Sequence, residues 1–278
     1  MVDISFIILT RNSQELIERC LNTYSCSIDQ AGFKAEFIVI DNASQDKTVE
    51  KVNRVFLLMP KSCTGYTIAL PKNLGTTKSR NLGLKRATGR FCVICDSDTE
   101  FMSGDWRQAI SYLEENKSVG IIAGHLYYKD KTTQHSVKRF PTLVDKLLKL
   151  RKYFLDMPES ATDYYENFDW GKTKEVDTAI SAFWLFRKDL LAQIGLLDEK
   201  IFYAPEDVDF CLRVWKSGKK IVYYPGLEIL HKTQRISYAK PLSYIALSHI
   251  WGLFYYFNKH HYWFCRKTLY AKIQANSN

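Results

Sequence analysis

The sequence has little that would mark a disordered, fibrous or repetitive protein. Its 278 residues show no low-complexity stretch and no internal repeat, and 46% of them are hydrophobic against 25% charged. This balance is typical of a globular chain. The length suffices for one large α/β domain, or for one domain with an appended tail.

A signal peptide is also missing. The first residues lead directly into the strand-like apolar segment from Ile4 to Leu9, with Asp3 ahead of it and no small-residue cleavage pattern. We therefore expect the chain to stay in the cytoplasm.

The common nucleotide-binding loops are absent. No G-x-G-x-x-G pattern follows the first apolar segment, which argues against a Rossmann dinucleotide site. Gly171-Lys172-Thr173 resembles the end of a phosphate loop, but Glu166 stands where that loop needs its upstream glycine. Neither of these two nucleotide-binding loops is therefore predicted in this chain.

The cysteines show no convincing metal or redox pattern. Their number, seven, is odd, and they are scattered along the chain. Cys92 and Cys95 have the spacing of such a pair, but they lie in an apolar strand without a second pair. We expect buried structural thiols here.

The net charge of +9 calls for an anionic partner. Nucleic acid, an anionic membrane surface and phosphorylated substrates would all fit such a charge. No nucleic-acid-binding motif accompanies it, so we do not expect nucleic acid as a partner. Much of the excess lies between Lys138 and Lys152 and in the C-terminal tail.

Strands and helices alternate in the first half of the chain. The expected strands are Ile4 to Leu9, Phe37 to Ile40, a weaker one at Tyr66 to Leu70, and Phe91 to Cys95. The expected helices begin at Ser13, at Asp46 and near Thr76, the last ending near Arg86. This alternation predicts an α/β fold with a doubly wound, mainly parallel sheet.

The second half is less regular. We expect an irregular segment at 126–176, a strand at 179–186, a helix at 206–217, short strands at 221–224 and 227–230, and a C-terminal helix from 241. The predicted division is a catalytic domain of residues 1–239, with a nucleotide-binding half (1–100) and an acceptor-binding half (101–239). Residues 240–278 form the C-terminal helical tail.

Polar residues follow three of the expected strands. They are Thr10-Arg11-Asn12, Asp41-Asn42 and Asp96-Ser97-Asp98. Ligands of doubly wound sheets bind at the carboxyl ends of the strands. Three polar strand ends therefore locate a binding site.

Asp96 and Asp98 are spaced to share one face of an extended chain. Two carboxylates so placed repel each other unless a cation lies between them, and Mg²⁺ or Mn²⁺ prefers such oxygen ligands. The alternative is that they cap a helix or stabilise a loop. His231 follows another apolar strand, where a lone histidine is more often a core or surface residue than a metal ligand.

Further charged residues have two interpretations each. Glu206 and Asp207 begin an expected helix, where acids complement the helix dipole, but a carboxylate could equally act as a general base. Lys78 and Arg80 follow Gly75 in another helix. They either neutralise a diphosphate or are ordinary solvated charges.

Taken in order, the motifs resemble family 2 glycosyltransferases. The matching segments are Ile7 to Asn12, Val39 to Ser44, Lys78 to Leu84, Asp96 to Asp98, Leu197 to Phe202, Glu206 to Arg213, Tyr224-Pro225 and His231. The segments from Lys138 to Leu143, Asp169-Trp170 and Glu175 to Asp177 are similar to bacterial rhamnosyltransferases of surface-polysaccharide synthesis. The resemblance implies the GT-A fold and a nucleoside-diphosphate-sugar donor.

It also implies roles for particular residues. Asp207 would deprotonate the acceptor hydroxyl, so that the transfer inverts the anomeric configuration, while Asp98 and His231 would bind Mg²⁺ or Mn²⁺. The nucleotide would lie against Thr10, Arg11, Asn12, Asp41, Asn42, Lys78, Arg80, Asp96 and Ser97. We expect the acceptor, a glycan or a lipid-linked sugar, near Ser181, Trp184 and Glu206. The donor would be dTDP-rhamnose or a UDP-sugar.

The tail carries a long uncharged segment. No charged residue lies between Lys240 and Lys259, but the segment is borderline in length for a membrane span. Basic and aromatic residues follow it, which favours an interfacial helix at the inner face of the cell membrane. A helix packed on the domain or in a homodimer interface is the alternative.

Two other functions are compatible with parts of the pattern. A sugar nucleotidyltransferase also uses a doubly wound sheet and a metal, but it carries a glycine-rich basic loop where this chain has Thr10-Arg11-Asn12-Ser13. A non-catalytic nucleotide-sugar-binding module would not need Asp98, Asp207 and His231 together. Both are weaker interpretations than a transferase.

Overall fold

The computed structural model describes residues 1–148, 163–233 and 244–275. Its first half contains β1 (Ile4–Thr10), α1 (Ile17–Gln30), β2 (Ala35–Asp41), α2 (Thr48–Leu58), β3 (Cys63–Ala69), α3 (Gly75–Arg86), β4 (Phe91–Asp96), β5 (Thr99–Gly104), α4 (Trp106–Glu115) and β6 (Val119–Tyr127). Its second half contains β7 (Val137–Lys138), β8 (Lys174–Glu175), β9 (Thr178–Ala179), β10 (Phe183–Arg187), α6 (Leu190–Ile194), α7 (Glu206–Lys216), β11 (Lys220–His231), α8 (Tyr244–His260) and α9 (Arg266–Ala275).

The described strands form one large sheet in the order β3-β2-β1-β4-β10-β6-β11-β5, with β8 beside β11. The four strands β3, β2, β1 and β4 are parallel to one another, and so are β6 and β11. Between these two groups, β10 runs antiparallel to both of its neighbours, β4 and β6. The predicted doubly wound, mainly parallel sheet is thus confirmed. Thr10 pairs with Asp41, and Leu9 pairs with Asp96, so the polar strand ends meet at one edge.

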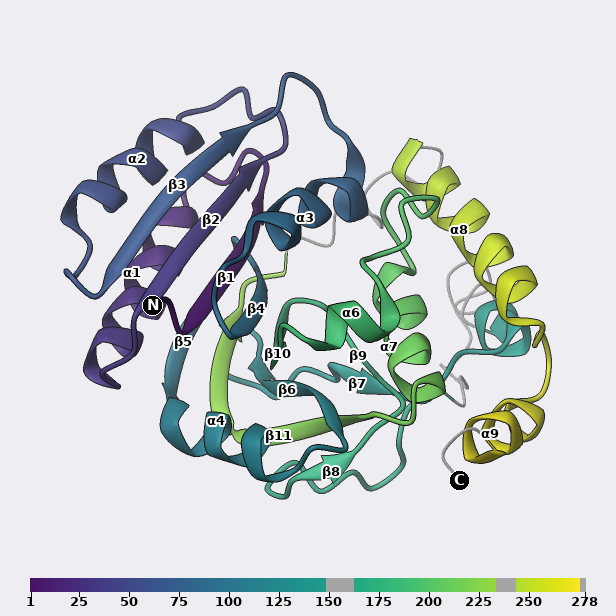
Figure 1. The fold of residues 1–278 in the computed structure, drawn as a ribbon. Helices are drawn as coiled ribbons and strands as arrows, with labels where there is room; N and C mark the ends of the chain where they lie inside the picture. The colour runs from purple at the N-terminus through teal and green to yellow at the C-terminus, as the bar shows by residue number, and fades with distance from the viewer. Residues whose placement is uncertain (149–162, 234–243, 276–278) are drawn as a thin grey trace.

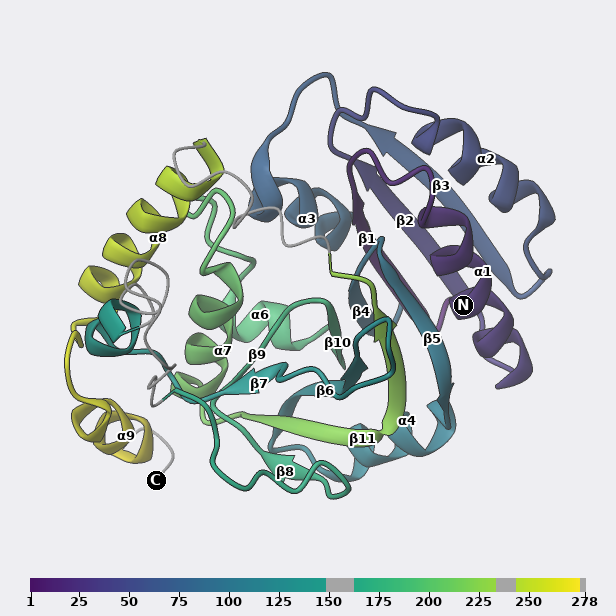
Figure 2. The ribbon, with the colours of Figure 1, turned by 180° about the vertical axis from the view of Figure 1, so that it is seen from behind.

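Helices cover both faces of this sheet (Figures 1 and 2). Because successive side chains of a strand point to opposite faces, Phe6 and Ile8 pack with α1, α2 and α4, whereas Ile7 packs with α3, α6 and α7. All three side chains are fully buried. This two-sided burial explains why the strands read as uninterrupted apolar segments.

The C-terminal helices are packed on the domain (Figure 1). Tyr256 and Phe257 of α8 and Leu269 of α9 are buried in a third apolar cluster that also contains Leu212 of α7. No helix among the described residues has the length and apolarity needed to cross a membrane. The expected boundary between 239 and 240 falls outside the described residues, and the division into halves stays a prediction.

Several predicted elements differ in detail. The two strands expected at 221–224 and 227–230 are one strand, β11, whose register with β6 shifts between Tyr224 and Glu228. The helix expected from Ser13 begins at Ile17, after a turn in which the carbonyl oxygen of Ser13 accepts from the N–H groups of Leu16 and Ile17. The expected strand at 179–186 is shorter, and Ser181 lies in the turn before β10. Part of the irregular segment, residues 149–162, lies outside the described residues.

Candidate functional site

A cavity of about 430 Å³ opens at the carboxyl ends of β1, β2 and β4, a volume typical of small-ligand sites. The strand ends and α3 contribute Leu9, Thr10, Arg11, Ser13, Asn42, Asn73, Gly75, Thr76, Arg80, Asp96, Ser97 and Asp98. The second half contributes Ile180, Ser181, Ala182, Phe202, Tyr203, Ala204, Glu206, Asp207, His231, Thr233 and His249. The cavity thus lies where doubly wound sheets bind their ligands.

Arg80 is a buried cation in the wall of this cavity. Its side chain donates to Asp96 Oδ1 at 2.5 Å and to Glu206 Oε1 at 3.2 Å. Its Nη1 also donates to the hydroxyl of Ser181 at 2.6 Å. A guanidinium suits this place because its planar fork bonds two carboxylates at once and keeps its charge when buried. Arg80 therefore holds the end of β4 and the start of α7 in a fixed relation.

Burial changes the proton affinity of the acids around Arg80. Burial raises the pKa of Asp96, although the charge of Arg80 opposes the change. Burial, with the neighbouring charge of Asp207, raises the pKa of Glu206 to about 8. Burial also raises the pKa of Asp207. The backbone N–H of Val208, which donates to this carboxylate at 2.8 Å, opposes the increase. Asp207 is therefore a stronger base than a free carboxylate, as deprotonation of a hydroxyl requires.

Asp96, Asp98 and His231 can hold a metal together. One ligand atom of each lies within 4.8 Å of the other two, and His231 Nε2 lies 3.5 Å from Asp98 Oδ1. The other ring nitrogen, Nδ1, bonds to the side-chain oxygen of Gln134 at 2.9 Å. This bond places a proton on Nδ1 and leaves Nε2 facing the carboxylates, the usual arrangement of a metal-ligating histidine. Two carboxylates and one imidazole suit Mn²⁺, and also Mg²⁺.

The loops after β1 and β2 are joined to each other. The N–H of Asn12 donates to Ser44 Oγ, and its side-chain oxygen accepts from the N–H of Gln45, both at 2.8 Å. Asp41 accepts from the N–H of Ser44 at 3.0 Å. Asn12 and Ala43 have left-handed backbones, with φ of 50° and 62°. The side chains of Asn12 and Asp41 thus shape the loops, and neither lines the cavity.

Asn42 fixes the beginning of α3. Its side-chain amide donates to Asn73 Oδ1 at 2.7 Å, and its side-chain oxygen accepts from the N–H of Leu74 at 2.8 Å. Gly75 follows with φ of +81°, and a Cβ there would lie 2.3 Å from the carbonyl oxygen of Phe202. Only glycine fits this close approach. The contact places the 202–204 segment over the cavity.

Thr10 presents a polar group that lacks a partner within the described chain. Its hydroxyl is buried and makes no hydrogen bond there, and the residue lines the cavity. An unpaired buried hydroxyl costs free energy, which a polar ligand atom would recover. Ser97 lies nearby in the lining, with its hydroxyl 2.9 Å from that of Ser13.

The structure brings most of the predicted site residues to one cavity. They are Thr10, Arg11, Asn42, Arg80, Asp96, Ser97, Asp98, Ser181, Glu206, Asp207 and His231. Lys78 is exposed on α3 and does not line the cavity. The prediction that Trp184 contacts the acceptor is wrong. Its side chain is fully buried in β10, and its ring stacks on Phe210 of α7 with centroids 5.5 Å apart.

Two residues of the site carried no signal in the sequence. Gln134, the partner of His231, lies in the segment expected to be irregular, and its role depends on tertiary contact alone. His249 lines the cavity from α8, although it sits in an apolar segment of the tail. Burial lowers the pKa of His249 to about 4, and the charge of Lys146 adds to this effect. His249 is therefore neutral at neutral pH.

Comparison with known proteins gives a family match over most of the chain. The family described as glycosyl transferase family 2 matches residues 5–195. N-acetylglucosaminyl-diphospho-decaprenol L-rhamnosyltransferase of Mycobacterium tuberculosis is 32% identical over 97 residues, which are 34% of this chain and 32% of that protein. Poly(ribitol-phosphate) beta-N-acetylglucosaminyltransferase TarS of Staphylococcus aureus is 29% identical over 122 residues, 42% of this chain and 20% of that protein. The matched segments thus span about a third or less of these relatives.

Solved structures share the fold. Mannosyltransferase PcManGT from Pyrobaculum calidifontis, in complex with GDP-Man and Mn²⁺, has a TM-score of 0.61 at 18% identity, covering 99% of this chain and 68% of its own. TarS 1–349 from S. aureus, in complex with UDP-GlcNAc, has a TM-score of 0.56 at 20% identity, covering 86% and 62%. These likenesses confirm the predicted GT-A fold.

Proposed function

The chain belongs to glycosyl transferase family 2, and from this premise we propose that it is a metal-dependent, inverting transferase. Its donor would be a nucleoside-diphosphate sugar. The observation that carries the proposal is the shared cavity of three groups: the metal-holding set with Asp98 and His231, the buried cation Arg80, and the carboxylate of Asp207. Each supplies one requirement of glycosyl transfer from a diphosphate.

The proposed reaction follows from these groups. Asp207 takes the proton of an acceptor hydroxyl, whose oxygen then attacks the anomeric carbon of the donor from the face opposite the diphosphate. The bond to the diphosphate oxygen breaks, and the configuration inverts. Asp98 and His231 would hold Mg²⁺ or Mn²⁺, which when bound supplies charge stabilisation for the departing diphosphate. A second carboxylic acid is not needed, because a metal-bound diphosphate leaves without protonation, in contrast to a glycosidase leaving group.

The donor side of the cavity is built from the first half of the chain. Thr10, Arg11, Asn42 and Ser97 surround the place for the nucleoside, and Asp96 is held toward it by Arg80. Relatives of the same fold bind UDP-GlcNAc or GDP-Man, and the rhamnosyltransferase relative supports rhamnose as the sugar. We propose dTDP-rhamnose or a UDP-sugar as the donor.

The acceptor side is built from the second half. Ser181, Glu206 and His249 present polar groups there beside Asp207. With a pKa of about 8, Glu206 keeps its proton at neutral pH and can donate a hydrogen bond to an acceptor oxygen. The decaprenol-linked acceptor in the name of one relative supports a lipid-linked sugar. We propose a glycan or lipid-linked acceptor in cell-surface polysaccharide synthesis.

A donor screen tests the proposal. Nucleoside diphosphate release is measured for dTDP-rhamnose, UDP-sugars and GDP-mannose, with Mg²⁺ or Mn²⁺ and with and without a pool of glycan acceptors. We expect acceptor-dependent release for one donor, reduced by about 10²- to 10⁴-fold in Asp207→Asn. Asp189→Asn, an exposed acid far from the cavity, is the matched control and should leave release unchanged.

Three outcomes would refute the proposal. Acceptor-dependent release that survives in Asp207→Asn would exclude this residue as the base. Binding of a nucleotide sugar without turnover of any donor would instead favour a non-catalytic binding module. Release of pyrophosphate from a nucleoside triphosphate and a sugar phosphate would favour a nucleotidyltransferase.

A further inference from the structure

Helix α8 exposes a row of apolar side chains. Tyr244, Leu247, Ile250, Trp251 and Phe254 are 69%, 55%, 65%, 65% and 54% exposed. Tyr244, Leu247, Trp251 and Phe254 follow one another at three or four residues, and Ile250 lies four before Phe254. This spacing places all five on one side of the helix, which we name the α8 apolar face. A single exposed apolar residue is ordinary, but a contiguous row of this size marks an interaction surface.

Aromatic contacts continue this face beyond the helix. The rings of Trp251 and Phe254 are nearly parallel, with centroids 6.0 Å apart, and Phe254 meets Trp263 edge-on at 5.4 Å. Phe264, next along the chain, is 67% exposed. Tryptophan, tyrosine and phenylalanine of this kind are enriched where proteins meet the interfacial layer of a bilayer.

The charged residues of the C-terminal segment all have one sign. No residue from 229 to 278 is Asp or Glu, whereas seven are basic: Lys232, Arg235, Lys240, Lys259, Arg266, Lys267 and Lys272. Some of these form ion pairs within the domain, but Lys267 and Lys272 on α9 are exposed. This segment therefore presents no acidic side chain to an anionic surface, and each of its basic residues near such a surface adds attraction.

The other side of α8 forms part of the cavity. His249 lines the cavity, and Gly252 lies so close to the 202–205 segment that a Cβ there would be 2.2 Å from the carbonyl oxygen of Ala204. At the start of the helix, Tyr244 of the α8 apolar face also meets Phe202, another lining residue, edge-on at 5.1 Å. One helix thus separates the α8 apolar face from the acceptor side of the cavity.

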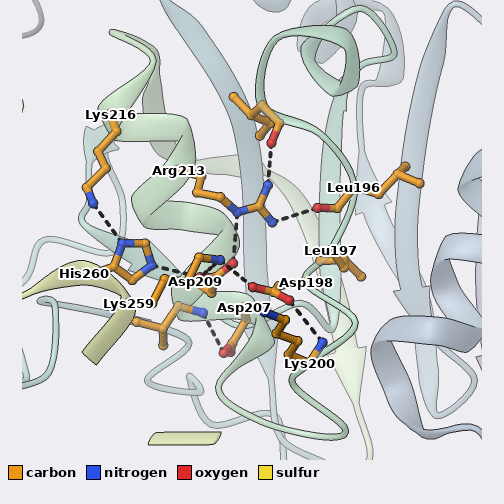
Figure 3. Close-up of polar contacts among 12 residues, drawn as sticks. Leu196, Leu197, Asp198, Lys200, Asp207, Asp209, Arg213, Lys216, Lys259 and His260 are labelled. Carbon is orange, nitrogen blue, oxygen red and sulfur yellow. Dashed lines mark hydrogen bonds and ion pairs between the residues drawn. The ribbon is translucent and has the colours of Figure 1, made fainter. Parts of the chain in front are cut away.

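An ion pair and a hydrogen bond to one buried carboxylate fix α8 to the catalytic domain (Figure 3). Lys259 Nζ lies 2.7 Å from Asp209 Oδ1, and His260 Nε2 lies 2.8 Å from the same oxygen. Asp209 stands two residues after Asp207 on α7, and its side chain is fully buried. The α8 apolar face therefore keeps a constant orientation relative to the proposed base.

We propose that the α8 apolar face inserts into the interfacial layer of an anionic lipid bilayer. The cavity then opens at the level of the headgroups, where a lipid carries its sugar hydroxyl to Asp207. The docking is inferred from the exposed side chains alone. Only the statement that the acceptor is lipid-linked rests on the proposed function. Insertion parallel to the bilayer fits the 17 residues of α8, which are too few and too mixed to span it. A second copy fits less well, because a two-fold contact would bring two basic tails together.

Vesicle flotation of the full chain tests the docking. The vesicles contain phosphatidylcholine alone or with about 30% phosphatidylglycerol. We expect the protein to float with the anionic vesicles and less as salt increases. The triple variant Leu247→Asn/Ile250→Asn/Trp251→Asn should weaken partitioning by at least about tenfold, because three apolar side chains no longer leave water. Lys267→Gln/Lys272→Gln should weaken binding to anionic vesicles only.

Matched controls separate docking from folding and catalysis. Leu57→Asn/Leu58→Asn removes two exposed apolar residues of α2, on the other side of the molecule from α8, and should float as the parent protein does. Transfer to a water-soluble acceptor should be unchanged in the triple variant, because none of its three residues lines the cavity. Loss of that transfer would concern the proposed function and not the docking.

Three results would overturn the docking. The parent protein could fail to float with anionic vesicles, or the triple variant could float equally well. Light scattering could also show a dimer that the triple variant dissociates, without vesicle binding by either protein. The last result would assign the α8 apolar face to a second copy of the chain.

Discussion

His260 Nε2 on α8 lies 2.8 Å from Asp209 Oδ1 on α7. The two residues are 51 positions apart in sequence, and their contact joins the two helices. Arg213 and Lys259 reach the same carboxylate at 2.9 and 2.7 Å. These partners hold the pKa of Asp209 well below its usual range despite burial. The carboxylate is therefore charged at every physiological pH and forms the centre of the α7–α8 contact.

Replacing Asp209 by Asn should destabilise the protein by up to about 3–5 kcal/mol, because Arg213 and Lys259 lose a charged partner and His260 an acceptor. Urea denaturation of both proteins at pH 7 measures the difference. Asp198→Asn removes a more exposed acid that also bonds Lys259, and should cost less. Equal stability of Asp209→Asn and the parent protein would show that the contact contributes nothing net.

The same carboxylate predicts a pH dependence. The pKa of Asp209 is lowered on folding, so its contribution is fully present above the pKa of an unfolded aspartate, about 3.9. The contribution is lost as the pH falls below that value. The difference in unfolding free energy between the parent protein and Asp209→Asn should therefore shrink from pH 5 toward pH 2. A constant difference over this range would contradict the ion pairs.

Glu206 predicts the opposite slope. Its pKa is raised from 4.5 to about 8 by burial and by Asp207. As the pH rises, the unfolded chain releases this proton at a lower pH than the folded chain. The free energy of unfolding therefore decreases from pH 4.5 to pH 8, by up to about 1.4 kcal/mol per pH unit. Glu206→Gln should remove this part of the slope in thermal or urea unfolding. If both proteins show the same slope, Glu206 is not protonated in the folded state.

Gln134 should matter for metal affinity through His231. Gln134→Ala frees Nδ1 of the imidazole and should weaken Mn²⁺ binding by about 10- to 100-fold. Calorimetric titration with Mn²⁺ in the presence of UDP measures this affinity. Gln193→Ala, at an exposed position on α6, is the control. His231→Ala should bind Mn²⁺ at least as weakly as Gln134→Ala. If both variants bind Mn²⁺ as the parent protein does, the metal lies elsewhere.

Arg80 should be irreplaceable by lysine. Arg80→Lys keeps a charge but cannot bond Asp96, Glu206 and Ser181 together, so the geometry of the site is lost. Arg80→Met should destabilise the fold, because Asp96 loses its cation and Glu206 and Ser181 lose their hydrogen-bond donor. Thermal unfolding and nucleotide titration measure both effects. Unchanged nucleotide affinity in Arg80→Lys would refute a role for the fork.

Much of the fold was readable because burial imposes strong patterns. The runs at Ile4 to Leu9 and Phe91 to Cys95 are apolar because helices cover both faces of β1 and β4. The region from β5 to β6 was not predicted, although α4 carries a sequence signal. Asp105 caps it by accepting from the N–H groups of Arg107 and Gln108.

The site was readable where it depends on strand ends, and unreadable where it depends on contacts between distant segments. Asp98 and His231 come from β4 and β11, whose ends a motif can locate. Gln134 and His249 join the site only through packing of an irregular segment and of α8. Trp184 was misplaced because both faces of β10 are covered, so its side chain is buried, whereas Ser181 and Ala182 in the turn before β10 line the cavity.

The close approach of Gly252 to Ala204 has a consequence for divergence among relatives. With the proposed docking, one helix would determine both where the protein resides and which molecules its cavity admits. A change that adapts its outer side to a different surface therefore tilts His249 within the inner wall. Exchanging α8 between two relatives should therefore transfer the site of membrane docking and the acceptor preference together.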